Sequence, residues 1–451
     1  MLKSLTCRLF RQQEDEASRR LLDERSLDQW KQEPIDKYKL VYWIYFLYGV
    51  AMLLPWNVFI TASEFFVKRF AETPYQETFQ NYFSTYSTLT NFLTFIIVLW
   101  LQNKSSFRLN SFIPICINTA VFAAMAITVK VDFEGIDYFW FVMFFIVLTG
   151  GTTSFFQNSV FSEASRLPPV YVQAVVSGQG VAGVVVAISS IVSALAGSGN
   201  RVPDEASITR SAFLYFLFAL LITTAAMIGR ILVTQLPFYG YYMNLQARHD
   251  QEVDQQSEEE RAVTVIDIVR KSYGLIFAVA YVFAITLMLF PSLTALIKST
   301  YRQNDSMKNS NRFFDDDIFV AFHFLLFNIG DWVGRTLPVS ERFQVFRAKT
   351  LINLSLLRTV FIPLFLVCNV IVSEKRRLPV LISNDFVYFF LVWIFAVSNG
   401  WIGGLCMMAA PQQATIKSGA EKSMVGSVMS FALVLGLAIG GLLSFAIRQI
   451  V

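Results

Sequence analysis

Long apolar runs, separated by short polar stretches, follow one another along the chain after residue 38. An α-helix needs about 20 mostly apolar residues to cross a bilayer, and most of these runs are about that long. The pattern predicts eleven membrane-spanning helices, at 39–66, 82–101, 111–130, 138–160, 170–197, 211–235, 272–296, 317–337, 350–373, 385–405 and 424–447. We therefore expect an all-α integral membrane protein.

Two polar segments divide these spans into domains. Residues 1–38 carry charges of both signs and lack the apolar centre of a cleavable signal peptide, so we expect a cytosolic N-terminal tail. Residues 236–271 contain QEVDQQSEEER and form the longest polar interruption, which we expect to be a flexible cytosolic linker loop. The linker separates six spans from five. This division suggests an N-terminal bundle at 39–235 and a C-terminal bundle at 272–451 around a central path.

Composition supports a membrane protein and narrows the chemistry. Hydrophobic residues make up 55% of the chain and charged residues only 16%, whereas a soluble protein carries about 25% charged residues. No basic patch with interleaved aromatic residues indicates nucleic acid binding. The four cysteines and two histidines show no metal-ligand spacing, so we expect no metal and no cofactor. Lysine and arginine favour the loops on the side of the tail, which predicts a cytosolic N-terminus and an outer C-terminus.

One predicted span, around FNIGDWVGR, contains a carboxylate and a guanidinium. A charged residue at the centre of a bilayer costs about 2.5–3.5 kcal/mol on insertion scales, so Asp331 and Arg335 need partners or a task. On a helix, Asn328, Asp331 and Arg335 share one face, and the charged residues can pair. The pair could simply lock helices together. Alternatively, it could hold an uncharged, hydroxyl-rich solute, because the carboxylate accepts and the guanidinium donates hydrogen bonds.

Other spans carry polar or aromatic residues beside possible kinks. In LLPWN, Pro55 removes a backbone donor and predicts a kink, with Trp56 and Asn57 directly after it. Phe290 precedes a proline in the same way, and Gln157 places an amide among aromatic residues. These residues could face a central cavity, where an amide can read a planar base. They could equally serve packing, interfacial contact or an interhelical hydrogen bond.

The segment GQGVAG at 178–183 fits the dinucleotide-binding pattern GxGxxG, but its context does not. It lies inside an apolar helix, with no preceding strand and no acidic residue about 20 positions later. Small residues in a membrane helix allow two backbones to approach closely. We interpret Ser177 and the glycines as a packing seam, with Gln179 as a polar contact within it.

Taken together, LLPWNVFITASEFF, SGQGVAG, the Phe290–proline pair and FNIGDWVGR resemble the equilibrative nucleoside transporter family. The resemblance extends from about residue 37 over nearly the whole chain, and PWN together with FNxxDxxGR is its most specific part. It implies a major-facilitator-like architecture with one central site that opens alternately to either side. It also implies facilitated transport of purine and pyrimidine nucleosides, with nucleobases left open.

The resemblance assigns substrate-binding roles to a set of residues. Gln157 matches the residue that contacts the nucleobase, and the pair on the eighth helix matches the groups that hold the ribose. Ile60 departs from the methionine of some members, a position associated with bulky inhibitors. The complete expected set is Leu53, Trp56, Asn57, Ile60, Phe92, Gln157, Phe290, Asn328, Asp331 and Arg335, with Phe95 as a further wall position.

Several alternatives to facilitated nucleoside transport remain open at this stage. A proton-coupled carrier would use a titrating group, for which His323 and Asp331 are the candidates, and another facilitator-type carrier could take sugars. An enzyme would need a metal cluster or a nucleophile with its base, and a channel would need a ring of pore charges. We expect neither. We expect a monomer in the lipid bilayer of the plasma membrane, with the vacuolar or lysosomal membrane as the alternative.

Overall fold

A computed structural model describes residues 34–102, 110–131, 133–196, 205–245, 263–300, 316–371 and 379–450. Most of the expected tail at 1–38 and about half of the expected linker at 236–271 lie outside the described residues. The described part of the chain is helical, apart from turns and one isolated antiparallel bridge between Ile297 and Val370. The expected all-α class is therefore confirmed.

The helices follow the hydropathy pattern closely. The first half of the chain forms α2 (Leu40–Thr61), α3 (Ser63–Arg69), α4 (Phe79–Gln102), α5 (Phe112–Thr128), α6 (Gly135–Ala164), α7 (Pro169–Ala196) and α8 (Glu205–Gln235). The second half forms α10 (Val265–Leu289), α11 (Asp316–Thr336), α12 (Ala348–Leu357), α13 (Phe361–Leu366), α14 (Asp385–Ala409) and α15 (Gly419–Ile450).

The number of membrane crossings differs slightly from the expectation. Within the described ranges, ten helical segments are long and apolar enough to cross a membrane. The third expected span, at 111–130, corresponds to α5, a shorter apolar helix of 17 residues. The count of eleven spans therefore stays a prediction.

Prolines interrupt the regular helix in two of the expected spans, although each of the two is still a single segment long and apolar enough to cross a membrane. α10 ends at Leu289 rather than at residue 296, because Phe290 precedes a proline and adopts an extended backbone (φ −112°, ψ 128°). The expected span at 350–373 is divided by a 3-10 turn at Arg358–Val360, because the ring of Pro363 would clash with the carbonyl of residue 359 in a regular helix. By contrast, α2 continues through Pro55.

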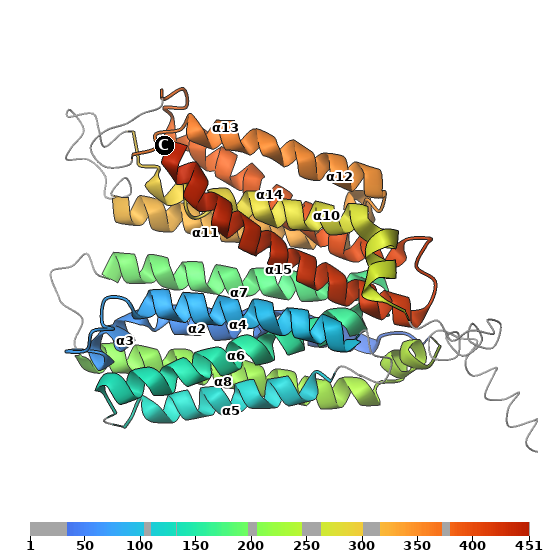
Figure 1. Cartoon of the computed structure of the whole chain (residues 1–451), viewed down its shortest axis with the longest axis horizontal. Helices are drawn as coiled ribbons and strands as arrows, with labels where there is room; N and C mark the ends of the chain where they lie inside the picture. The colour runs from blue at the N-terminus through green and yellow to red at the C-terminus, as the bar shows by residue number, and fades with distance from the viewer. Residues whose placement is uncertain are drawn as a thin grey trace, which may run out of the picture.

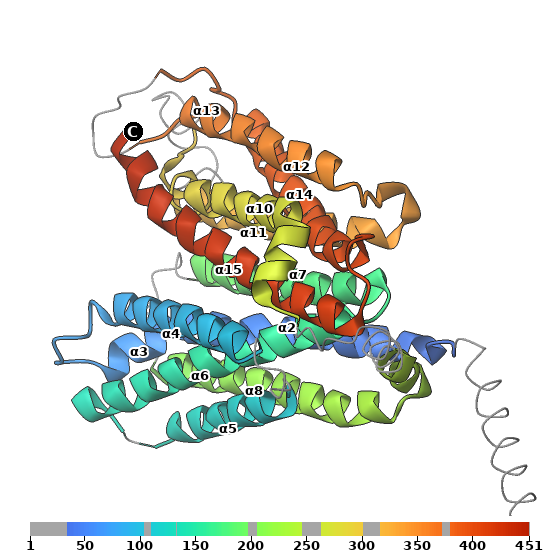
Figure 2. The same ribbon diagram turned by 45° about the vertical axis from the view of Figure 1, so that its right-hand side comes forward.

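The helices of each half of the chain lie together (Figure 1). In the first half, α2 packs against α7 and α8, and in the second half α10 packs against α15 and α11 against α14. Contacts between the halves run mainly from α7 to α11 and from α6 to α15. Figure 2 shows α15 leaving the first-half helices as it runs toward the C-terminus.

The hydrophobic core is shared at one end of the molecule and divided at the other. One cluster combines residues from both halves, including Val41 and Val175 from the first and Ile268 and Val425 from the second. A second cluster, around Phe66, contains only first-half residues, and a third, around Phe395, contains only second-half residues. The two halves are therefore packed together at the end where α2 and α15 begin, and they have separate cores where these helices end.

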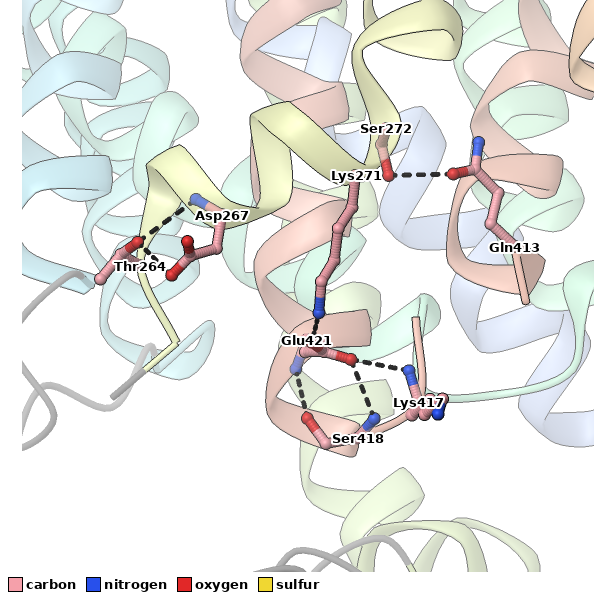
Figure 3. A network of polar contacts seen from close by, with 8 residues as sticks. All are labelled: Thr264, Asp267, Lys271, Ser272, Gln413, Lys417, Ser418 and Glu421. Carbon is pink, nitrogen blue, oxygen red and sulfur yellow. Dashed lines mark hydrogen bonds and ion pairs between the residues drawn. The ribbon is translucent and has the colours of Figure 1, made fainter. Parts of the chain in front are cut away.

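Polar contacts tie α10 to α15 at the shared end (Figure 3). Lys271 of α10 forms an ion pair with Glu421 of α15. Glu421 also accepts a hydrogen bond from the backbone N–H of Ser418 at 3.2 Å, and the Ser418 hydroxyl accepts one from the Glu421 N–H at 3.0 Å. This reciprocal pair is a capping box, which satisfies free donors at the start of α15.

Candidate functional site

The charged pair of α11 is buried at the contact between the two halves of the chain. Nε of Arg335 donates to Oδ2 of Asp331 at 2.7 Å, and the two residues are 8% and 7% exposed. Nη1 of Arg335 reaches α7 in the first half, where it donates to the carbonyl of Val176 at 3.1 Å and to Oε1 of Gln179 at 3.4 Å. The intramembrane charges thus have the partner that their spacing predicted, and one of them also contacts the other half.

The second oxygen of Asp331 contacts Asn399, a residue outside the sequence motifs. Nδ2 of Asn399 on α14 donates to Oδ1 of Asp331 at 2.6 Å. Oδ1 of Asn399 in turn accepts from the hydroxyl of Thr286 on α10 at 2.6 Å. Both carboxylate oxygens are therefore hydrogen-bonded, which offsets much of the cost of burying the charge.

Glycines allow the surrounding helices to come this close. A Cβ on Gly180 of α7 would lie 3.1 Å from Cδ of Arg335, and one on Gly183 would overlap the amide oxygen of Asn328. On α14, a Cβ on Gly400 would overlap the backbone of Asp331. The packing interpretation of GQGVAG is confirmed, because Gly180 and Gly183 allow α11 to approach α7 while Gly178 allows α2 to do so.

An aromatic cluster continues the site along α11. The rings of Phe290 and Phe327 stack with centroids 3.8 Å apart, and Phe324 lies 4.8 Å from Phe290. Nδ2 of Asn328 donates to the carbonyl of Phe324 in its own helix at 2.8 Å. Phe290, directly after the end of α10, thus packs against the same helix, α11, that carries Asn328 and the charged pair.

Gln157 and Phe92 meet consecutive residues of α15. Nε2 of Gln157 donates to the Ser430 hydroxyl at 3.0 Å, and Phe92 stacks on Phe431 with centroids 5.8 Å apart. The interhelical hydrogen bond considered for Gln157 therefore exists, and it joins α6 of the first half to α15 of the second. Phe95 also contacts Phe431, with centroids 6.4 Å apart.

The expected site residues of α2 are more dispersed. Asn57 lines a largely apolar cavity of about 250 Å³ between α2, α7 and α8, and none of the other expected site residues lines this cavity. Leu53 and Trp56 are half-buried, whereas Ile60 is 44% exposed. The structure thus groups the α11 residues with Phe290 and groups Gln157 with Phe92, but it does not gather the whole expected set around this cavity.

Asn399 and Thr286 are polar residues beside the charged pair that the sequence motifs did not indicate. Each stands as a polar residue within an apolar run, which is the signal that selected Asp331. Their contacts join different helices, so no spacing rule within one helix reveals them.

A helical protein with many membrane-spanning segments, whose buried charged pair connects its two halves, has the construction of a membrane carrier. Comparison with known proteins specifies the carrier. The family model "Nucleoside transporter" matches residues 143–449. The chain is 30% identical to equilibrative nucleoside transporter 1 of Homo sapiens, covering 93% of this chain and 99% of that protein. It is 24% identical to equilibrative nucleotide transporter 1 of Arabidopsis thaliana, and the alignment covers 92% of this chain and 87% of that protein.

The chain belongs to the equilibrative nucleoside transporter family, as the sequence motifs predicted. This family consists of transporters rather than enzymes. Among solved structures, the chain is similar to a major facilitator superfamily proton:xylose symporter, XylE, bound to 6-bromo-6-deoxy-D-glucose, with 11% identity and a TM-score of 0.47 over 91% of this chain and 87% of that one.

Proposed function

We propose that this chain carries purine and pyrimidine nucleosides across a membrane by facilitated diffusion, with the charged pair of α11 as the centre of its substrate site. Family membership supports the substrate class. The observation that supports the site is the spare hydrogen-bonding capacity of the pair: the described residues offer Nη2 of Arg335 no partner, while Nε and Nη1 are engaged. A guanidinium with free donors beside a carboxylate can bind the hydroxyls and ring heteroatoms of a neutral nucleoside.

Around this centre, the remaining expected residues would complete the site. Gln157 would exchange its hydrogen bond with Ser430 for one with the base, and Phe290 would provide an aromatic wall against it. Leu53, Trp56, Asn57, Ile60, Phe92 and Asn328 complete the proposed set.

Alternating access would involve the two bundles, at 39–235 and 272–451. The bundles share a core at one end only, so a substrate could enter between the separate cores at the other end. Rocking of one bundle against the other would then open the shared end. We propose the plasma membrane as its location, with a cytosolic N-terminus, an outer C-terminus and a monomeric state.

A competition experiment tests the proposed substrate class. Cells that express the chain should take up labelled adenosine with saturation, and unlabelled uridine or adenosine should block this uptake while hexoses should not. Cells carrying the empty vector provide the background. Adenosine uptake no higher than this background, together with saturable uptake of a labelled hexose, would show that the chain is a sugar carrier instead.

A further inference from the structure

Arg358 is a buried cation that the proposed substrate site does not use. It lies in the 3-10 turn between α12 and α13 and is 1% exposed. Nη1 donates to the carbonyl of Phe395 at 3.0 Å, and the guanidinium carbon lies 4.7 Å from the centroid of the Phe395 ring. The ion pairs of the described residues do not include Arg358, so its charge is held by neutral groups. A desolvated charge of this kind is costly, and in a membrane span it usually marks a functional region.

Hydrogen bonds connect Arg358 to Asp331 through two intermediate residues. Nη2 of Arg358 donates to the Thr286 hydroxyl oxygen at 2.8 Å. The Thr286 hydroxyl donates to Oδ1 of Asn399 at 2.6 Å, and Nδ2 of Asn399 donates to Oδ1 of Asp331 at 2.6 Å. The chain of contacts thus crosses from the α12–α13 junction through α10 and α14 to α11.

The chemistry of Arg358 and Asp331 fixes the donor-to-acceptor direction of this series of hydrogen bonds. A guanidinium can only donate, so Thr286 must accept from Arg358 and point its own proton elsewhere. An ionised carboxylate can only accept, so Asn399 must turn its NH2 group toward Asp331 and its oxygen toward Thr286. The Thr286 proton also lies within reach of its own-helix carbonyl on Val282, at 2.8 Å, and the bond to Asn399 is the shorter of the two. The donor Arg358, acting through Thr286, and the acceptor Asp331 therefore favour the same orientation of the Asn399 amide.

We propose that Arg358 and Thr286 are positioning residues for nucleoside binding, which act through Asn399 to fix the Asp331 carboxylate. This inference rests on the proposed function. Arg335 donates to one oxygen of Asp331, and Asn399 donates to the other. The orientation of the carboxylate plane is therefore fixed from both sides. Each oxygen keeps a lone pair in a defined direction, ready to accept a bond from a sugar hydroxyl. Fixing the acceptor in advance reduces the ordering cost of binding.

Thr286→Val is the sharpest variant for testing this role. Valine has nearly the shape of threonine but can neither accept from Arg358 nor donate to Asn399, whereas removal of the Arg358 side chain would leave a large void. Thr286→Ser restores the hydroxyl. Thr223→Val is the matched control, because Thr223 is also buried and its hydroxyl donates only to carbonyls of its own helix, those of Ala219 and Leu220.

The measurement compares transport of uridine with that of 2′,3′-dideoxyuridine, which lacks the hydroxyls that Asp331 would bind. In Thr286→Val we expect KM for uridine to rise about tenfold, as for the loss of one buried hydrogen bond, while KM for the dideoxy analogue changes by less than about twofold. Thr286→Ser should recover most of the uridine affinity. Thr223→Val should leave both KM values unchanged.

The outcomes separate this inference from the proposed function. An equal rise in KM for both ligands would show a general structural role for Thr286 and overturn the positioning role. So would a Thr286→Val variant that transports uridine with unchanged KM. If the unmodified chain shows no saturable uridine uptake, the proposed function itself fails.

Discussion

Asp331 and Arg335 also form hydrogen bonds with neutral groups of α14 and α7, respectively, so either charge left alone would keep neutral partners but would lose its counter-charge. Breaking a buried pair by removing one partner costs about 3–5 kcal/mol, whereas exposed pairs contribute little. Substitutions at this pair therefore affect both binding and packing. Their effects on transport have to be measured on protein that has reached the membrane.

We expect Asp331→Asn to reduce uridine uptake at least about tenfold, because asparagine cannot accept on both of its polar atoms and leaves Arg335 without a counter-charge. Arg335→Ala should reduce uptake further, since it also removes the donors to Val176 and Gln179. Initial rates of labelled uridine uptake, normalised to surface-biotinylated protein, measure both effects. Normal uptake by correctly inserted variants would mean that the pair serves packing alone.

For individual residues, the sequence predicted the pair of Asp331 and Arg335 but not the contacts of this pair with other helices. The i, i+4 spacing of Asp331 and Arg335 on one helix face was sufficient to predict their contact. The contacts of Asp331 with Asn399, and of Arg358 with Thr286, join residues on different helices and depend on how those helices cross. Helix crossings follow from glycine positions and side-chain packing in three dimensions, which a linear pattern does not contain.

Among the helices, α6 and α15 form a close contact between the two halves of the chain, which we call the seam. A Cβ on Gly426 of α15 would overlap the Phe161 carbonyl of α6 and the hydroxyl of Ser165, which directly follows this helix. We expect Gly426→Ala to push these helices apart and loosen the end of the molecule with the shared core. Ser162 faces Ser423 across the seam. A cysteine introduced by Ser162→Cys should react with a thiol reagent several-fold faster when Gly426→Ala is also present than when Gly426 is retained.

The same substitution elsewhere in α15 serves as the control for Gly426→Ala. A Cβ on Gly441 would only reach ordinary contact with Leu287, at 3.7 Å. Gly441→Ala should therefore leave both uptake and the reactivity of the introduced cysteine unchanged. Equal effects of the two alanines would indicate a general response of α15 to lost flexibility rather than a clash at the seam.

The polar contacts at the start of α15 lead to a prediction about stability. Lys271 contributes an ion pair whose lysine side chain is 38% exposed, and such pairs are worth about 1 kcal/mol or less. Glu421 is also part of the capping box with Ser418. Glu421→Ala should therefore lower the free energy of unfolding by about 1–2 kcal/mol, and Lys271→Ala by less. Thermal unfolding of purified protein in detergent measures both, and a larger loss for Lys271→Ala would contradict this explanation.

Helix positions were largely predictable because lipid requires long apolar runs, and most observed ends lie within about a turn of the predicted ones. Two of the exceptions, at the end of α10 and between α12 and α13, follow from prolines. Pro363 converts the turn at Arg358–Val360 to 3-10 geometry, and that turn directs Arg358 inward. Hydropathy alone cannot show this, since proline within an apolar run can be tolerated, as it is in α2.

At the level of the whole molecule, the sequence did not predict that the hydrophobic core is shared by both halves at one end and separate at the other. Apolar residues lie along every span, and nothing in their order shows which end packs across the two halves. The structure shows that residues near the start of α2 join a core common to both halves, while residues near its end pack within the first half only. A carrier that alternates must exchange these two arrangements, so the shared core has to be stable enough to form and weak enough to open.

The same arrangement bears on whether transport is coupled to protons. A neutral nucleoside bound to the self-neutralising pair of Asp331 and Arg335 moves no net charge. His323, the other candidate for coupling, is 0% exposed and packed against aromatic rings, with centroids 4.9 Å from Phe324 and 6.0 Å from Phe290. In this arrangement a proton has no direct route between His323 and water. We therefore expect proteoliposomes with an inward proton gradient to fill with labelled uridine only to its external concentration. Accumulation above that level would establish coupling, and its loss in His323→Leu would then assign the proton to His323.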